Sequence, residues 1–157
     1  MAKWISKKDA LKKLQRYCAY QDRCHQEVRN KLRDLGLYGD DLEEVITDLI
    51  TDNFLNEERF ARSYARGKFR MKQWGRVRIK RELKQRRVSD YCIRKAMEEI
   101  DESDYQETLK QVLEKRLPKI KETKAYQVRK KLADYAVRRG YEMGLAWEQA
   151  KQIVPDV

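Results

Sequence analysis

A dense run of lysines and arginines in the middle of the chain is the sequence feature best suited to chemistry. Residues 59–95 hold fifteen bases and only two acids, Glu82 and Asp90, whereas the rest of the chain holds 22 bases and 24 acids. Such a concentrated block of one sign indicates a partner of the opposite sign. The partner could be nucleic acid, through its phosphates, or a protein with an acidic groove. The alternative is a solvated helix surface, although such surfaces usually mix both signs.

The bases that follow Trp74-Gly75 have helical spacing. If Gly75 caps the helix and Ile79 and Leu83 point inward, bases three or four residues apart share one exposed side. These cations repel one another in an isolated helix, and a negatively charged partner relieves that repulsion. Arginine suits bidentate contacts to carboxylate or phosphate, and the tryptophan could stack on an unpaired base. The candidate contact residues are Trp74, Arg76, Arg78, Lys80, Arg81, Lys84 and Arg87.

Residue patterns that support catalysis or metal binding are missing from the sequence. There is no phosphate-binding loop, no zinc-protease motif and no serine-nucleophile motif. His25 is the only histidine, which leaves no histidine-based acid–base pair. Cys18, Cys24 and Cys92 lack metal-ligand spacing and fit thiols of a reducing compartment. We therefore expect no enzymatic activity, no cofactor and no metal site.

Composition and apolar spacing predict an all-α protein. Charged residues make up 40% of the chain, hydrophobic residues 41%, and only two prolines and six glycines interrupt them. Apolar positions three or four residues apart recur almost throughout, and no segment alternates as a strand would. No run of 18 apolar residues exists and the first six residues lack a signal-peptide core, so we expect a cytoplasmic protein without a membrane partner.

Several residues are suited to mark helix ends. Asp22 and Asn56 are candidate N-caps, and Ser103 with Gln106 forms a capping-box pattern. Gly36 is suited to a left-handed cap at a helix C-terminus. These capping residues divide the chain into short helices joined by tight turns.

The chain also contains an internal repeat with a period of about fifty residues. Each copy is predicted to contain three helices, with a tight turn before the last. The predicted units span 6–52, 56–101 and 103–154. We expect them to stack into an elongated, curved body. In the second copy Arg87 stands where the others have glycine, so we expect its turn to lack the glycine cap. The matched helix and turn positions are Val28, Leu32 and Leu37, then Ile79, Leu83 and Val88, then Leu132, Ala136 and Tyr141.

The segments Asn53–Tyr64 and Trp74–Leu83 closely resemble the RecX family, which has an aromatic-rich Arg-Phe-Ala stretch followed by a Gly-x-x-x-Ile-x-x-Glu-Leu helix. The likeness continues in Glu27–Leu32 and in Arg138–Tyr141 and covers nearly the whole chain. It implies three tandem three-helix repeats. It also implies a cytoplasmic modulator that binds the RecA–DNA filament and hinders its growth, ATP hydrolysis and strand exchange without a cofactor.

Other functions remain open from the sequence. A helical nucleic-acid-binding module that works without RecA would use the same bases, and single- or double-stranded DNA is a possible direct partner in either case. A third interpretation is that the chain is an interaction scaffold for some other acidic protein. A sequence-specific DNA reader is disfavoured because the bases are spread over two helices and the unit occurs three times. Without coiled-coil heptads to promote self-association, we expect a monomer.

Overall fold

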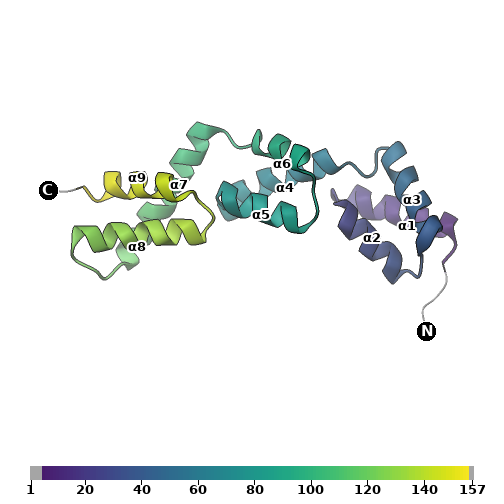
Figure 1. The fold of residues 1–157 in the computed structure, drawn as a ribbon, viewed down its shortest axis with the longest axis horizontal. Coiled ribbons are helices and arrows are strands. Elements are labelled where there is room, and N and C mark those ends of the chain that lie inside the picture. Colours follow the sequence, from purple (N-terminus) through teal and green to yellow (C-terminus); the bar gives the residue numbers. More distant parts are fainter. Residues whose placement is uncertain (1–4, 156–157) are drawn as a thin grey trace. The chain divides into compact units, whose positions relative to one another are not determined.

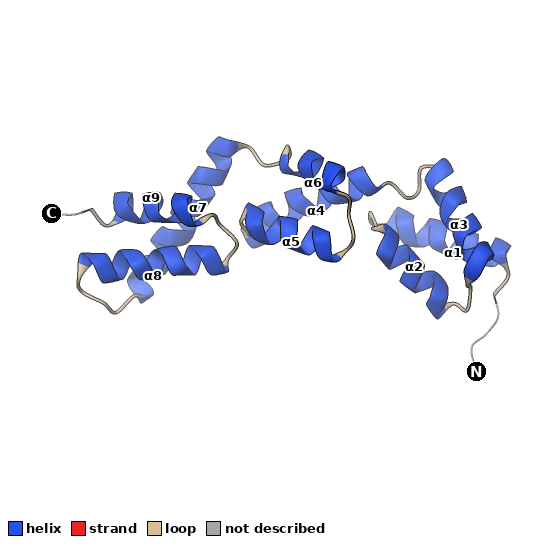
Figure 2. Cartoon of the chain, viewed as in Figure 1, coloured by secondary structure: helices blue, strands red, loops and turns tan. Residues whose placement is uncertain are grey.

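The computed structural model describes residues 5–155, which are helical with no strand (Figure 2). The predicted all-α fold is therefore confirmed. No helix in this part of the chain has both the length and the apolar character needed to cross a membrane. The helices follow one another in the order shown in Figure 1: α1 (Lys7–Tyr20), α2 (His25–Asp34), α3 (Gly39–Thr51), α4 (Glu57–Lys72), α5 (Arg76–Gln85), α6 (Asp90–Met97), α7 (Glu102–Arg116), the short 3₁₀ helix η1 (Leu117–Lys119), α8 (Ala125–Arg138) and α9 (Met143–Ile153).

The described residues form two compact units by their internal contacts. One contains the chain up to Ser63 together with Leu83–Ala96, and the other contains Tyr64–Glu82 together with the chain from Met97 onward. The helices α4, α5 and α6 each pass from one unit to the other. The predicted ends at 52 and 101 and the predicted start at 56 fall in the loops that follow α3 and α6, whereas the predicted start at 103 lies in the first turn of α7. That each repeat is a separate domain stays a prediction.

The first unit has a core formed by apolar residues of α1, α2 and α3. The helix α2 begins differently from the prediction: its N-cap is Cys24, whose Sγ accepts a hydrogen bond from the Glu27 amide at 3.4 Å. The Glu27 carboxylate in turn accepts from the Cys24 amide. Asp22 instead accepts a hydrogen bond from Arg59 Nε at 2.7 Å. The core residues with no exposed surface are Ala10, Leu14, Val28, Leu32, Val45 and Leu49.

The second unit contains a cluster of packed aromatic rings. The ring centroid of Tyr105 on α7 lies 5.9 Å from that of Phe69 and 5.1 Å from that of Tyr141. The helices α8 and α9 lie side by side and both contact α7 (Figure 1). Asp101 caps α7 by accepting a hydrogen bond from the Asp104 amide at 3.0 Å. The predicted Ser103–Gln106 cap is therefore wrong.

The internal repeat is visible in the backbone hydrogen bonds of three equivalent turns. The amide after each turn donates to a carbonyl five residues earlier: Leu37 to Leu32, Val88 to Leu83, and Tyr141 to Ala136, at 2.9, 3.2 and 3.0 Å. These are the positions that the sequence comparison matched. The residue between has a positive φ in each copy, at 89° for Gly36, 60° for Arg87 and 99° for Gly140.

The second turn lacks a glycine cap, as expected, yet Arg87 keeps the geometry of the other two turns. Arg87 adopts the left-handed backbone that glycine adopts in the other copies, because the same two hydrogen bonds close the helix end. A side chain in this region costs about 1–2 kcal/mol.

Arg87→Gly is expected to stabilise the protein by about 0.5–1 kcal/mol, since glycine removes the left-handed strain but loses more entropy on folding. The melting temperature, followed by circular dichroism, should rise by about 1–4 °C. Gln85→Gly, at the end of α5 where the backbone is helical, is the control and should lower it. A fall in melting temperature for Arg87→Gly would show that the turn is not strained.

Candidate partner-binding surface

The turn between α8 and α9 holds the start of α5 in place. The Gly75 amide donates to the Arg139 carbonyl and the Val77 amide donates to the Gly140 carbonyl, both at 2.9 Å. These bonds satisfy amides that have no partner within a helix at its N-terminus. Ile79 and Leu83 have no exposed surface, as predicted, so the opposite side of α5 faces solvent.

Gly75 and Gly140 are the residues that permit this contact. A Cβ on Gly75 would lie closer than 3.0 Å to the Gly140 carbonyl, and a Cβ on Gly140 would lie closer than 3.0 Å to Arg78. Gly140 also has a φ of 99°. The backbones therefore approach too closely for any side chain at either position.

Arg76 lies in a cluster of charged and aromatic groups at this contact. Its Nε donates to Glu142 at 2.9 Å, its Nη1 donates to Glu102 at 2.7 Å, and its guanidinium lies 3.9 Å from the centroid of the Tyr105 ring. The Tyr105 hydroxyl accepts from the Arg76 amide and donates to Glu142. Burial, and then the hydrogen bond to Glu142, raise the pKa of Tyr105 and keep it a neutral donor. Of the Arg76 side chain only 21% is exposed.

Trp74 and Arg78 form a second cluster beside the first. The Arg78 guanidinium lies 3.9 Å from the centroid of the Trp74 ring, and Lys68 Nζ lies 5.0 Å from it. Tyr64 meets the same indole edge-on at 6.5 Å. Trp74 and Arg78 are both half-buried. The predicted stacking of Trp74 on a base stays untested, and its ring already contacts two cations.

The remaining candidates are exposed and have no partner. The side chains of Lys80, Arg81, Lys84 and Arg87 have no hydrogen bond or ion pair with any described residue. Lys80 and Lys84 lie one turn apart on α5, with Arg87 in the turn that follows. We call these four residues the α5 basic surface. The structure thus divides the seven candidates into three held by internal contacts and four available to a partner.

Arg76→Ala is expected to destabilise the protein by about 1–2 kcal/mol, because it removes two carboxylate contacts and a cation–π contact in a partly exposed setting. Urea unfolding of this variant, of Glu142→Gln and of the double variant measures the coupling. Lys80→Ala, which removes an exposed cation without a partner, should change stability by less than about 0.5 kcal/mol. Unchanged stability in Arg76→Ala would mean that this arginine has no structural role.

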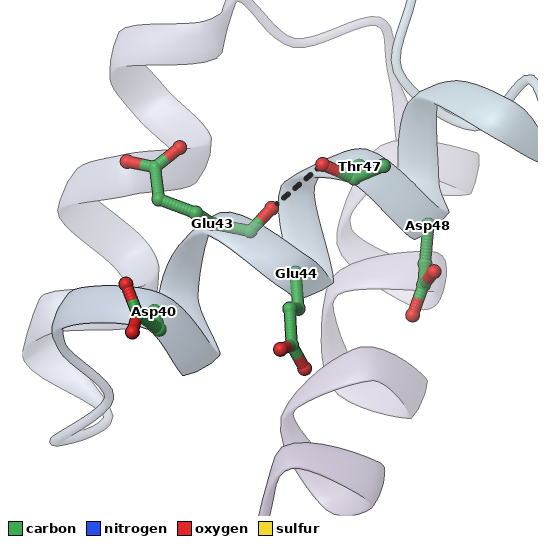
Figure 3. Close-up of a pocket in the computed structure, with 5 residues that line it drawn as sticks. All are labelled: Asp40, Glu43, Glu44, Thr47 and Asp48. Atoms are coloured by element: carbon green, nitrogen blue, oxygen red, sulfur yellow. Dashed lines mark hydrogen bonds between the residues drawn. The ribbon is translucent and has the colours of Figure 1, made fainter.

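The structure also shows an acidic hollow on α3. Its volume is about 460 Å³, and its lining residues are Asp40, Glu43, Glu44, Thr47 and Asp48 (Figure 3). Two of these carboxylates already have partners, because Glu44 pairs with Lys7 and Glu43 pairs with Arg29. Among residues 5–155 no group of histidine, cysteine, aspartate or glutamate side chains is placed to hold a metal ion. We assign no ligand to this hollow.

The three cysteines are buried free thiols. Burial raises the pKa of Cys18 and Cys24 to about 11 and raises that of Cys92 as well. A thiol with a raised pKa is a poor nucleophile and a poor metal ligand at neutral pH.

Comparison with known proteins identifies the family. The second three-helix domain of RecX matches residues 56–97, and the third matches residues 102–148. Regulatory protein RecX of Prosthecochloris aestuarii is 32% identical over 141 residues, which is 88% of this chain and 91% of that protein. The chain belongs to the RecX family. Membership makes it a regulatory protein and not an enzyme, and it confirms the resemblance seen in the sequence.

Other RecX proteins agree in sequence or in fold. Regulatory protein RecX of Bacillus mycoides is 29% identical over 125 residues, 80% of this chain, and the match spans 46% of that longer protein. The crystal structure of RecX from Lactobacillus salivarius superposes with a TM-score of 0.85 at 21% identity, covering 94% of this chain and 96% of that one. The three-helix fold of RecX is therefore shared by proteins whose sequences are only distantly similar.

All seven candidate residues fall in the segment that matches the second RecX domain. The partners of Arg76 (Glu102, Tyr105 and Glu142) fall in the segment that matches the third. The Arg76 cluster therefore joins the second and third RecX domains. Sequence reasoning missed this because the partners lie 26 to 66 residues from Arg76.

Proposed function

We propose that this chain binds the RecA–DNA filament and restrains its growth, ATP hydrolysis and strand exchange, and that the α5 basic surface makes the contact. The observation that carries the proposal is a row of four cations without internal partners inside the second RecX domain. The RecX family resemblance supplies RecA as the partner.

Electrostatics supports a polyanionic or acidic partner for this row. Lys80, Lys84 and Arg87 follow one another at intervals of four and three residues, so each cation repels the next. A partner that supplies phosphates or carboxylates removes this cost and speeds the encounter. Arg76 and Arg78 act differently in this proposal: Arg76 binds Glu102 and Glu142 of the third domain, and Arg78 packs on Trp74.

The test is RecA's single-stranded-DNA-dependent ATP hydrolysis, titrated with this protein at two salt concentrations. Strong suppression well below one molecule per RecA subunit is expected, because a protein that blocks filament growth acts on many subunits at once. Suppression should weaken at the higher salt, since exposed charges make the contact. Absence of suppression at both salt concentrations would contradict the proposal.

A second candidate function is nucleic-acid binding independent of RecA. It is favoured by the same exposed bases, which phosphates would also satisfy. Equal, salt-sensitive binding to bare single-stranded DNA and to RecA filaments would support it. A scaffold for another acidic protein would show neither behaviour. The expected monomeric state stays a prediction that sedimentation can test.

A further inference from the structure

Three exposed aliphatic side chains lie where the start of α5 meets the α8–α9 turn. Val77 belongs to the first turn of α5, Val137 to the last turn of α8, and Met143 is the first residue of α9. Their exposed fractions are 46%, 37% and 52%. The part of the chain that the structure describes exposes two other large aliphatic side chains, Ile50 on α3 and Met71 on α4. Single exposed apolar residues are ordinary, whereas a group of them indicates a binding surface.

Hydrogen bonds hold these three residues around Gly140. The Val77 amide donates to the Gly140 carbonyl and the Gly140 amide donates to the Val137 carbonyl, both at 2.9 Å. Met143 follows Glu142, whose carboxylate accepts a hydrogen bond from the residue before Val77. We call the three residues the junction apolar surface. Because these bonds already fix its backbone, a partner that binds there has little ordering cost to overcome.

The side chains of the junction apolar surface suit a binding role. Valine in a helix has one strongly preferred rotamer, so burying Val77 or Val137 against a partner costs little entropy. Methionine is flexible and polarisable, so Met143 can adapt to the shape of a partner. All three are left exposed by the fold, and covering their apolar area would be favourable.

Unpaired cations flank this surface. Lys80 and Arg81 follow Val77 at intervals of three and four residues and therefore share its side of α5. Arg138 follows Val137 on α8. These three cations are exposed and make no ion pair with any residue that the structure describes. The two carboxylates at this contact already bind a guanidinium. The available charge around the apolar residues is therefore positive.

An apolar centre flanked by cations indicates a protein partner more than a nucleic acid. Phosphate and sugar contacts are polar, and base edges offer aliphatic side chains little besides the thymine methyl group. Protein interfaces combine an apolar centre with a polar rim and are enriched in methionine and arginine. Charge complementarity requires the rim of the partner to be acidic.

We propose that the junction apolar surface binds an apolar side chain of an acidic protein segment, whose carboxylates pair with Lys80, Arg81 and Arg138. The inference rests on the proposed function, because it takes the RecA subunits of the filament, and not the DNA, as the partner. It adds a second component to the contact made by the α5 basic surface. That component is the burial of apolar area, which salt does not screen.

Dissociation constants for RecA filaments at two salt concentrations test the proposal. Filaments assembled on a biotinylated oligothymidylate with a slowly hydrolysed ATP analogue are immobilised, and the same DNA without RecA is the second surface. Val77→Thr with Met143→Gln keeps the branching and length of the two side chains but makes them polar. This variant should bind filaments roughly 10-fold more weakly at both salt concentrations, because the lost apolar burial is not screened. Its binding to bare DNA should equal that of the wild type.

Three further variants separate apolar burial from charge. Lys80→Gln with Arg81→Gln should lose more affinity at the lower salt concentration than at the higher one, since exposed charges are screened. Ile50→Thr is the matched control, because Ile50 on α3 has the same 46% exposure as Val77, and it should bind as the wild type does. Val77→Ile with Met143→Leu keeps the surface apolar and should also retain binding.

The outcomes distinguish this inference from the proposed function. Circular dichroism establishes that each variant is folded, and the bond from the Val77 amide does not involve its side chain. Equal filament affinity for the wild type and Val77→Thr with Met143→Gln would overturn the inference and leave the proposed function intact. A loss confined to the lower salt concentration, or an equal loss on bare DNA, would also overturn it. A wild type that binds filaments at neither salt concentration would contradict the proposed function, and with it the partner assigned here.

Discussion

Lys80→Glu, Arg81→Glu and Lys84→Glu, made together, are expected to abolish the suppression of RecA's ATP hydrolysis by this protein while its helix content stays unchanged. The three side chains are exposed and have no internal partner, so their reversal costs the fold little. Each reversal replaces an attraction to the acidic partner with a repulsion. Three such changes should weaken the contact roughly 100-fold or more, at about 1.4 kcal/mol for each factor of ten.

The matched control reverses three exposed lysines of α1: Lys8→Glu, Lys12→Glu and Lys13→Glu. This variant has the same net charge as the α5 variant, and suppression should remain close to that of the wild type. Unchanged suppression by the α5 variant at low and moderate salt would show that the α5 basic surface is not the docking site. Equal losses in both variants would attribute the effect to net charge.

Gly140→Ala is expected to destabilise the protein strongly. The new Cβ would lie closer than 3.0 Å to Arg78, and the residue would be held at a φ of 99°. Overpacking and left-handed strain each cost about 1–3 kcal/mol, so the free energy of unfolding should fall by about 3 kcal/mol. Gly75→Ala, whose Cβ would meet the Gly140 carbonyl, should act through the same contact.

Two other glycines of the same unit provide controls. A Cβ on Gly67 in α4 or on Gly144 in α9 would meet nothing within 4 Å, and neither has a positive φ. Gly67→Ala should therefore stabilise its helix by about 0.5–1 kcal/mol. Urea unfolding followed by circular dichroism compares all four variants. A Gly140→Ala protein as stable as the wild type would show that the α5 start and the α8–α9 turn are not in close contact.

The helices and their repeat were predictable because both depend on local spacing. The offsets that relate Leu32, Leu83 and Ala136 reappear as the same backbone hydrogen bond in each copy. The errors are local as well. The sequence predicts Asp22 and Ser103 as N-caps, but the nearby residues Cys24 and Asp101 cap the two helices. Several residues near a helix start can cap it, and the chain path selects among them.

Arg87 shows how hydrogen bonding overrides a residue preference. A sequence rule that requires glycine at a left-handed position weighs only the steric cost of a side chain. The two bonds that close the end of α5 at Lys84 and Leu83 offset that cost. The turn geometry is therefore retained although the preferred residue is missing.

The candidate surface was predictable in part. The buried side of α5 followed from Ile79 and Leu83, and so did the exposure of Lys80 and Lys84. The internal partners of Arg76 did not follow, because Glu102 and Glu142 are distant in sequence.

Docking of the α5 basic surface on the RecA–DNA filament is tested most directly by co-sedimentation at physiological salt. Wild-type protein, the α5 variant and the α1 control are each mixed with RecA filaments on single-stranded DNA, and with the same DNA alone. The wild type and the α1 control should pellet with filaments far more strongly than with bare DNA, while the α5 variant stays in the supernatant. Pelleting of the α5 variant with filaments as strongly as the wild type would contradict the claim.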